Sequence, residues 1–166
     1  MLDIKFLVDA MLGKLTRFLR IFGYDTIYAN DLIDRYRTNP VPDKKLNEYA
    51  VWSKRIVITK DLPFYKEIKE NAILLEGEGV YNYLNQLKHK LNLDYEFNME
   101  KARCSVCNTT LKMVNNKYSI KEFVKSETFK NYNEFFQCNN PKCQKVFWNG
   151  PHIADIIKKL RDGMNY

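Results

Sequence analysis

The sequence predicts an α/β fold, a three-layer domain with a mainly parallel sheet, followed by a small metal-bound module. Two observations lead to this prediction. Short apolar runs typical of buried parallel strands alternate with helical patterns over residues 4–95. The four cysteines of the 166-residue chain all lie after residue 100. We therefore expect one domain over residues 1–98 and a second over residues 99–166.

The first predicted elements are a strand, a helix and a second strand. Residues 4–8 form a nearly continuous apolar run, which predicts a central strand that ends at Asp9. A helix follows and Gly23 ends it; its apolar residues are Leu12, Leu15, Phe18, Leu19 and Phe22, and Lys14, Arg17 and Arg20 fall on another face. Residues 24–29 predict the second strand, with Asp31 and Asp34 just beyond it.

The remaining elements of the first domain follow the same alternation. Residues 35–42 are polar with two prolines and predict a loop, and Asp43 is the N-cap candidate of an imperfect second helix. Further strands are predicted at 55–59 and, more weakly, at 73–75, followed by a turn at 77–79 and a helix over 80–91. A polar segment, 92–101, leads to the cysteines, and residues 153–160 predict a closing helix.

The cysteines are spaced as two short knuckles. Cys104 and Cys107 form C-x2-C, and Cys138 and Cys143 form C-x4-C, which is the spacing of a tetrahedral zinc site. Two disulfides or four buried thiols are the alternatives, but no N-terminal apolar signal segment is present, so we expect a reducing cytoplasm in which disulfides do not persist. His152 could also bind, although four thiolates already complete a structural site. Thirty residues separate Cys107 from Cys138, so an excursion must leave the metal between the knuckles.

The positive charge is concentrated in the cysteine-bearing part. Residues 1–100 hold 15 Lys+Arg against 15 Asp+Glu, whereas residues 101–166 hold 12 against 5. A basic surface of this kind attracts polyanions, most commonly nucleic acid. Aromatic residues alternate with lysines over 117–148, a composition that suits stacking of unpaired bases, although we expect more than half of them to be buried in the module's own core. No apolar stretch is long enough to span a bilayer, so we expect a soluble chain.

Carboxylates follow two of the predicted strands. Asp9 and Asp61 stand at the carboxyl ends of parallel strands, where ligands bind in open α/β sheets. Asp43, with Asp31 and Asp34, could converge on the same place. Clustered carboxylates raise one another's pKa unless a cation intervenes, and hard oxygen ligands suit magnesium or manganese. Asp43 and Asp61 could instead merely cap helices. The pattern favours metal-assisted phosphodiester chemistry.

Several segments are similar to a known family. Residues 6–15, 17–20 and 23–26 (FLVDAMLGKL, RFLR and GYDT) and residues 55–61 (RIVITKD) resemble the PIN-like RNase domain family named after the mut-seven C-terminal domain. Segments 103–108 (RCSVCN) and 147–152 (FWNGPH) resemble its zinc ribbon. The resemblance implies a PIN-type nuclease fold fused to a zinc ribbon. It also implies Asp9, Asp43 and Asp61 as the acidic cluster, with Asp43 matched through a D-x-x-L-x-x-x-A frame.

The chain departs from the family pattern at two places. A polar insertion precedes Asp43, and the C-x4-C knuckle is longer than the family's commoner C-x2-C. We expect a magnesium- or manganese-dependent ribonuclease in which Asp9 and Asp61 hold one ion and Asp43 binds it or a second one. Cleavage would leave a 5′-phosphate and a 3′-hydroxyl.

The expected partner is RNA, with ribosomal and transfer RNA as candidates, and a homodimer or a protein inhibitor is left open. Lys14 and Arg17 would contact phosphates, and Lys145 and Trp148 would contact RNA from the ribbon. Two alternatives remain. The chain could be a non-catalytic RNA- or ribosome-binding protein, or Asp9 could be the nucleophile of a phosphatase, although Met11 stands where the common phosphatase pattern has a second Asp.

Overall fold

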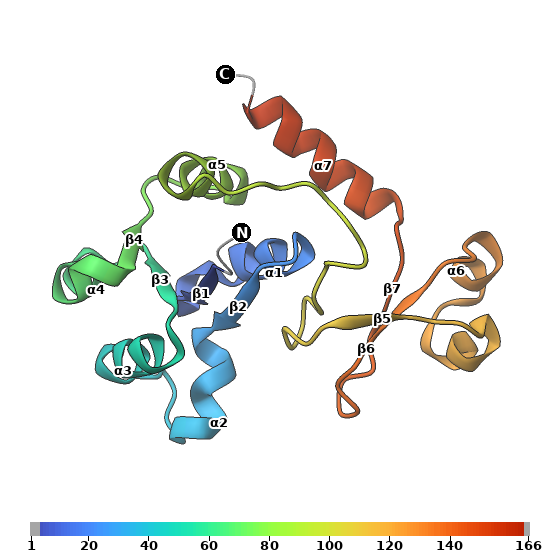
Figure 1. The fold of residues 1–166 in the computed structure, drawn as a ribbon, viewed down its shortest axis with the longest axis horizontal. Helices are drawn as coiled ribbons and strands as arrows, with labels where there is room; N and C mark the ends of the chain where they lie inside the picture. Colours follow the sequence, from blue (N-terminus) through green and yellow to red (C-terminus); the bar gives the residue numbers. More distant parts are fainter. Residues whose placement is uncertain (1–3, 165–166) are drawn as a thin grey trace.

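The computed structural model describes residues 4–164, and it confirms the α/β fold class with a parallel four-stranded sheet (Figure 1). The strands lie in the order β2-β1-β3-β4 and every neighbouring pair is parallel. Their bounds are β1 (Lys5–Val8), β2 (Asp25–Tyr28), β3 (Ile56–Thr59) and β4 (Ala72–Leu74). The predicted strands are therefore all present, each within a residue or two of its expected ends.

Alternate residues of the central strands enter two different cores. Phe6 and Val8 of β1 pack in one hydrophobic cluster, whereas Leu7 between them packs in the other. Successive side chains of a strand point to opposite faces, so a strand covered on both sides must be apolar throughout. This is why the predicted strands are continuous apolar runs.

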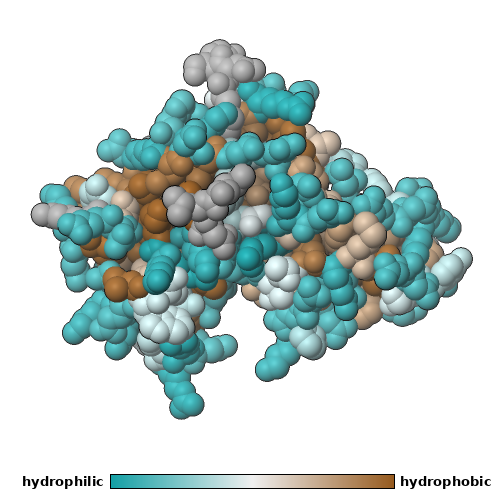
Figure 2. Space-filling model, viewed as in Figure 1, coloured by the Kyte–Doolittle hydropathy of each residue, from teal (hydrophilic) through white to brown (hydrophobic). Residues whose placement is uncertain are grey.

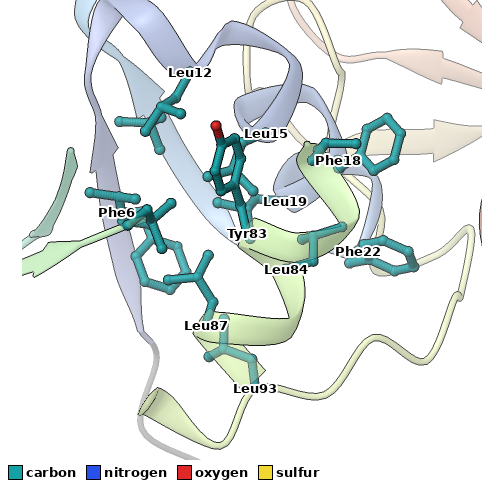
Figure 3. Packing of buried hydrophobic residues seen from close by; sticks show 14 of the residues in the cluster. Phe6, Leu12, Leu15, Phe18, Leu19, Phe22, Tyr83, Leu84, Leu87 and Leu93 are labelled. Carbon is teal, nitrogen blue, oxygen red and sulfur yellow. The ribbon is translucent and has the colours of Figure 1, made fainter. Parts of the chain in front are cut away.

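Helices cover both faces of the sheet and complete three layers. The first face is covered by α1 (Gly13–Ile21), α5 (Val80–Leu91) and α7 (Pro151–Met164). Figure 3 shows Tyr83, Leu84 and Leu87 of α5 packed against Phe6 of the sheet and side chains of α1. The second face is covered by η2 (Ala29–Leu32), α2 (Ile33–Tyr36), α3 (Asp43–Ser53) and α4 (Leu62–Ile68).

The closing helix α7 belongs to the core of the α/β unit. Its Ile156 and Leu160 are buried in the same cluster as α1 and α5, although the cysteine module precedes α7 in the chain. The end of the chain therefore returns to the first unit. The expected boundary between 1–98 and 99–166 stays a prediction.

The cysteine module is a small antiparallel sheet. Its strands lie in the order β5-β6-β7, with bounds β5 (Leu111–Met113), β6 (Phe136–Cys138) and β7 (Val146–Phe147). The expected excursion between the knuckles contains η4 (Lys117–Phe123) and α6 (Ser126–Asn131). Its small core is formed by buried Ile120, Phe135 and Val146.

Fewer aromatic residues of this module are buried than the sequence suggested. Phe135 and Phe136 are fully buried, but Tyr118 and Phe123 are exposed and the other aromatics are half-buried. The expectation that more than half would be buried is therefore wrong, because the small core of the module encloses one complete ring, that of Phe135, and Phe129, Tyr132 and Trp148 pack around it only partly buried. On the side of the molecule drawn in Figure 2, hydrophilic side chains cover most of the surface of both units. Within residues 4–164, no helix has the length and apolar character needed to cross a membrane.

Candidate active site and zinc centre

Asp9 and Asp61 lie together at the carboxyl ends of their strands because β1 and β3 are adjacent and parallel. This end of the sheet is called the acidic edge below. The side chain of Thr59, the last residue of β3, joins the two aspartates. Its hydroxyl donates to Asp9 Oδ2 at 2.6 Å and accepts from the backbone N–H of Asp61 at 2.9 Å. Thr59 is completely buried. The sequence reasoning missed this threonine, although its position between a β-branched strand and a strand-end carboxylate is a usable signal.

Backbone amides occupy part of both carboxylates. Asp9 Oδ1 accepts from the N–H of Ala10 at 2.6 Å, and Asp61 Oδ1 accepts from the N–H of Phe64 at 2.8 Å. Asp61 therefore caps α4, which was the alternative role expected for it, and it also lies at the end of β3. A carboxylate oxygen has two lone pairs, so these bonds leave sites for a further ligand.

Asp43 is the first residue of α3, and the N-cap is Pro42 instead, which corrects the N-cap expectation. The pKa of Asp43 is raised, first by partial burial and then by the negative charges of Asp9, Asp61 and Glu67. The structure thus places Asp43 close enough to Asp9 and Asp61 for their negative charges to act on it. Glu67 of α4 is a fourth acidic group that the sequence reasoning missed, because it follows no strand end and looks like an ordinary helix residue.

The donor set at this edge consists of hard oxygen atoms, which suits magnesium or manganese. Its three aspartates do not converge as closely as the cysteines do, since among residues 4–164 the four cysteines alone form a compact group of potential ligands. Magnesium usually keeps several waters and binds through one or two carboxylates. The residues at this edge therefore fit a partly hydrated hard cation.

Asp31 and Asp34 do not join this group. Asp31 Oδ2 pairs with the Arg20 guanidinium and accepts from the N–H of Tyr28 at 2.9 Å. Asp34 is exposed on α2, and neither residue is among the charges that raise the pKa of Asp43. Asp31 serves a structural ion pair.

The four cysteines form a compact group of sulfur atoms that could hold zinc. The Sγ atoms of Cys104 and Cys143 are 3.7 Å apart, those of Cys107 and Cys138 are 3.4 Å apart, and all four lie within 4.8 Å of one another. A tetrahedron with zinc–sulfur bonds of about 2.3 Å has sulfur–sulfur edges of about 3.8 Å. A disulfide requires about 2.05 Å, so the distances fit a shared ion and not a bridge. His152 is exposed and lies outside the group.

Local backbone geometry shapes both knuckles. The residue directly after the second cysteine of each knuckle has a left-handed conformation, with φ of 66° at Asn108 and 50° at Gln144. Burial raises the pKa of the Cys104 and Cys138 thiols. Burial also opposes ionisation of Cys107, but hydrogen bonds with Thr109 outweigh it and lower its pKa to about 6. A bound cation would offset the burial of the other thiolates.

The first knuckle docks on the open edge of strand β2. Arg20, only 2% exposed, donates through Nη1 to the carbonyls of Ser105 at 3.2 Å and Val106 at 2.9 Å, and through Nε to the carbonyl of Thr26 at 2.9 Å. Asn108 accepts from the N–H of Thr26 at 3.0 Å. These contacts cover a sheet edge that would otherwise expose unpaired backbone groups.

The sequence pattern placed Lys14, Arg17 and Arg20 on one face apart from the apolar residues, but Arg20 is buried. Lys14 and Arg17 are exposed as expected, but Arg20 points into the junction with the zinc module. The helical spacing of the three residues cannot separate them, because Arg20 is buried only by its contacts with the first cysteine knuckle and strand β2.

A cleft of about 340 Å³ lies between α1 and the cysteine module. Arg17 and Lys145 both line it, so two of the predicted RNA-binding residues share one site. Tyr28 also lines it and donates its hydroxyl to the carbonyl of Ala10, next to Asp9. The pKa of Tyr28 is raised by burial and by the charges of Asp31 and Asp9, so the cleft adjoins the acidic edge.

The other two predicted RNA-binding residues lie elsewhere. The ammonium of Lys14 lies 6.0 Å from the ring centroid of Phe18 on the surface of α1. Trp148 is half-buried against Phe135 and Tyr132, so it contributes to the module's core. A packed indole offers little free face for a base.

Comparison with protein families gives a match that spans nearly the whole chain. The family described as Mut7-C RNAse domain matches residues 4–160. Comparison with the curated proteins, and with the solved structures, gives no match. The family match covers the acidic edge, the four clustered cysteines and most of α7 together. The chain therefore belongs to the Mut7-C RNAse domain family.

Proposed function

We propose that this protein is a divalent-metal-dependent ribonuclease that hydrolyses RNA phosphodiester bonds, with Asp9, Asp43 and Asp61 as its catalytic carboxylates. The observation that carries the proposal is the pairing of Asp9 and Asp61 through Thr59 at one sheet edge, with Asp43 inside their electrostatic field. Membership of an RNase domain family supports the same reaction class. RNA is then the substrate class.

Each residue has a defined role in this proposal. Asp9 and Asp61 would hold Mg²⁺ or Mn²⁺, and Asp43 would bind the same ion or a second one. A bound ion of this kind lowers the pKa of a coordinated water and offsets charge that develops on the phosphate. The Thr59 hydroxyl orients Asp9 through Oδ2. Positioning of this kind is what places a nucleophile in line with phosphorus.

The cleft beside α1 supplies a path for the RNA backbone. Arg17 and Lys145 line it from the α/β unit and from the zinc module respectively, and Lys14 lies on the same helix as Arg17. Arginine and lysine contacts to phosphates position a strand without reading its sequence. The zinc module would add affinity through its surplus of positive charge, whereas Trp148 supports its core.

A non-catalytic RNA-binding or ribosome-binding function is the second candidate. The wider spacing of the three aspartates, compared with the cysteine group, favours this alternative. The basic module would bind RNA in either case. A cleavage assay separates the two functions.

The deciding experiment incubates the zinc-loaded protein with end-labelled RNA, without added metal and with magnesium or manganese. Omission of metal is preferable to a chelator, which would also remove zinc. The substitution Asp9→Asn should abolish cleavage and leave RNA affinity within about threefold, because phosphate contacts dominate affinity. Asp34→Asn is the matched control, since it removes a carboxylate that does not act on Asp43. Metal-dependent cleavage that survives in Asp9→Asn would refute the proposed site.

A further inference from the structure

An exposed aromatic and cationic patch lies on α2 and α3, away from the zinc module (Figure 1). The guanidinium carbon of Arg35 lies 5.2 Å from the ring centroid of Trp52, 5.4 Å from that of Tyr49 and 5.8 Å from that of Tyr36. The Tyr49 and Trp52 rings are themselves in contact, with centroids 5.7 Å apart. These four residues are called the stacking patch below.

The inner side of the patch packs against the hydrophobic core, and its outer side is exposed. Tyr36 and Tyr49 are half-buried and pack against the hydrophobic cluster beneath α3. Trp52 is 69% exposed, so its ring offers free surface. A contact that served only to hold α2 on α3 would be expected to bury the indole, which is the largest apolar side chain.

The charges around the patch favour an anionic ligand. Among the described residues, the ion pairs leave Arg35 without a carboxylate partner. Residues 34–54 hold five cations against three anions, with the cations Arg35, Arg37, Lys44, Lys45 and Lys54. Bases of single-stranded nucleic acid stack on aromatic rings and on arginine planes beside such charges.

The patch is better suited to a nucleotide strand than to a protein surface. A stable protein interface covers about 800 Å² on each partner and has an apolar centre. On α2 and α3, the large apolar side chains that are exposed are Trp52 and its neighbour Val51. One indole beside a guanidinium is enough to hold one base.

The patch shares helix α3 with Asp43 but lies on another side of it. Asp43 and Trp52 are nine residues apart, which is about 14 Å along the helix and about two and a half turns around it, so their side chains leave α3 on opposite sides. An RNA strand that reaches both must therefore pass around the helix. We propose that the stacking patch binds an unpaired base of single-stranded RNA. This inference rests on the proposed function in taking RNA as the ligand.

Binding measurements on the zinc-loaded protein without magnesium or manganese test the patch. The probes are a fluorescein-labelled, unstructured RNA of about twelve nucleotides and a blunt RNA duplex of the same length. Trp52→Ala should weaken binding of the single strand about tenfold and change duplex binding less than about twofold. Trp52→Phe keeps a ring and should retain most of the affinity. Val51→Ala, at a neighbouring residue that is 61% exposed, is the matched control and should bind as the parent does.

The intrinsic fluorescence of Trp52 gives a second readout that leaves the stacking patch itself unchanged. The chain has two tryptophans, so Trp148→Phe leaves Trp52 as the reporter. Single-stranded RNA should quench its emission, and duplex RNA should not. Unchanged emission, or equal loss of single-strand and duplex binding in Trp52→Ala, overturns the proposal.

The outcome is separable from that of the nuclease proposal. Trp52-dependent binding by a protein that never cleaves RNA supports the stacking patch and refutes the nuclease. Cleavage by a protein whose single-strand affinity is unchanged in Trp52→Ala supports the nuclease and refutes the stacking patch.

Discussion

Replacement of the buried Arg20 by lysine tests how strongly the zinc module depends on the α/β unit. The guanidinium of Arg20 donates to three backbone carbonyls, of Thr26, Ser105 and Val106, and to the carboxylate of Asp31. A lysine ammonium is a single point donor and cannot reach acceptors distributed around a planar fork. About two carbonyls should then lose their donor, at roughly 1–3 kcal/mol each, so Arg20→Lys should cost about 2–6 kcal/mol of unfolding free energy.

Urea unfolding of the zinc-loaded protein, followed by circular dichroism, measures this cost. Zinc affinity, measured by competition with a chromogenic chelator, should also fall, because two of the carbonyls belong to the first cysteine knuckle. Arg17→Lys is the matched control on the exposed side of the same helix and should stay within about 0.5 kcal/mol of the parent. A loss below about 1 kcal/mol in Arg20→Lys, with zinc affinity unchanged, would show that the junction does not hold the knuckle.

Further predictions concern zinc, pH, a backbone contact and the acidic edge. Removal of zinc by a chelator should melt the small antiparallel sheet, whose own core is too small to fold alone, and equal melting profiles with and without zinc would contradict this. Burial raises the pKa of Asp25, but the ion pair with the partly buried Arg55 and the hydrogen bond from Asn108 outweigh it, so the pKa is lowered. The contribution of this carboxylate to stability is therefore present above about pH 4 and lost as pH falls through the lowered pKa. Asp25→Asn should therefore destabilise the protein by about 3 kcal/mol at pH 7 and by much less near pH 2, measured by urea unfolding; a pH-independent difference would refute the ion-pair explanation. Gly23→Ala should lower the melting temperature, because φ is 90° there and the added Cβ would lie 2.8 Å from the carbonyl oxygen of Lys101; an unchanged melting temperature would mean that this segment can move away. Thr59→Val keeps the side-chain shape but removes the hydroxyl between the strand-end aspartates, so it should lower both the cleavage rate and the melting temperature, the latter because the Asp61 N–H loses its acceptor. Unchanged cleavage by the folded variant would exclude an orienting role.

The α/β architecture was predictable because its elements carry strong local patterns. Strands buried on both faces must be apolar throughout, and helices on a sheet must carry an apolar stripe. Helix α3 showed only an imperfect pattern, and the structure explains why. Val51 and Trp52 are exposed while Leu46 and Ala50 form its buried face, so apolar residues occur on both sides of this helix.

The candidate site was predictable where a residue follows a strand end. The carboxyl ends of adjacent parallel strands meet at one edge, so Asp9 and Asp61 had to lie close if β1 and β3 paired. Thr59 and Glu67 were missed because a buried threonine and a helical glutamate have many ordinary roles. Their importance depends on which side chains face them.

By itself the sequence determined the alternation of strands and helices, the two cysteine knuckles and the strand-end carboxylates, since each depends on local spacing or on the apolar pattern of one element. The tertiary structure alone decided that Arg20 is buried while Arg17 is free, that α7 completes the first core, and that Arg35 stacks on Trp52. These features depend on contacts between segments far apart in the chain or on different helices. A side chain's type limits which contacts it can make, but only the packed fold selects the partner.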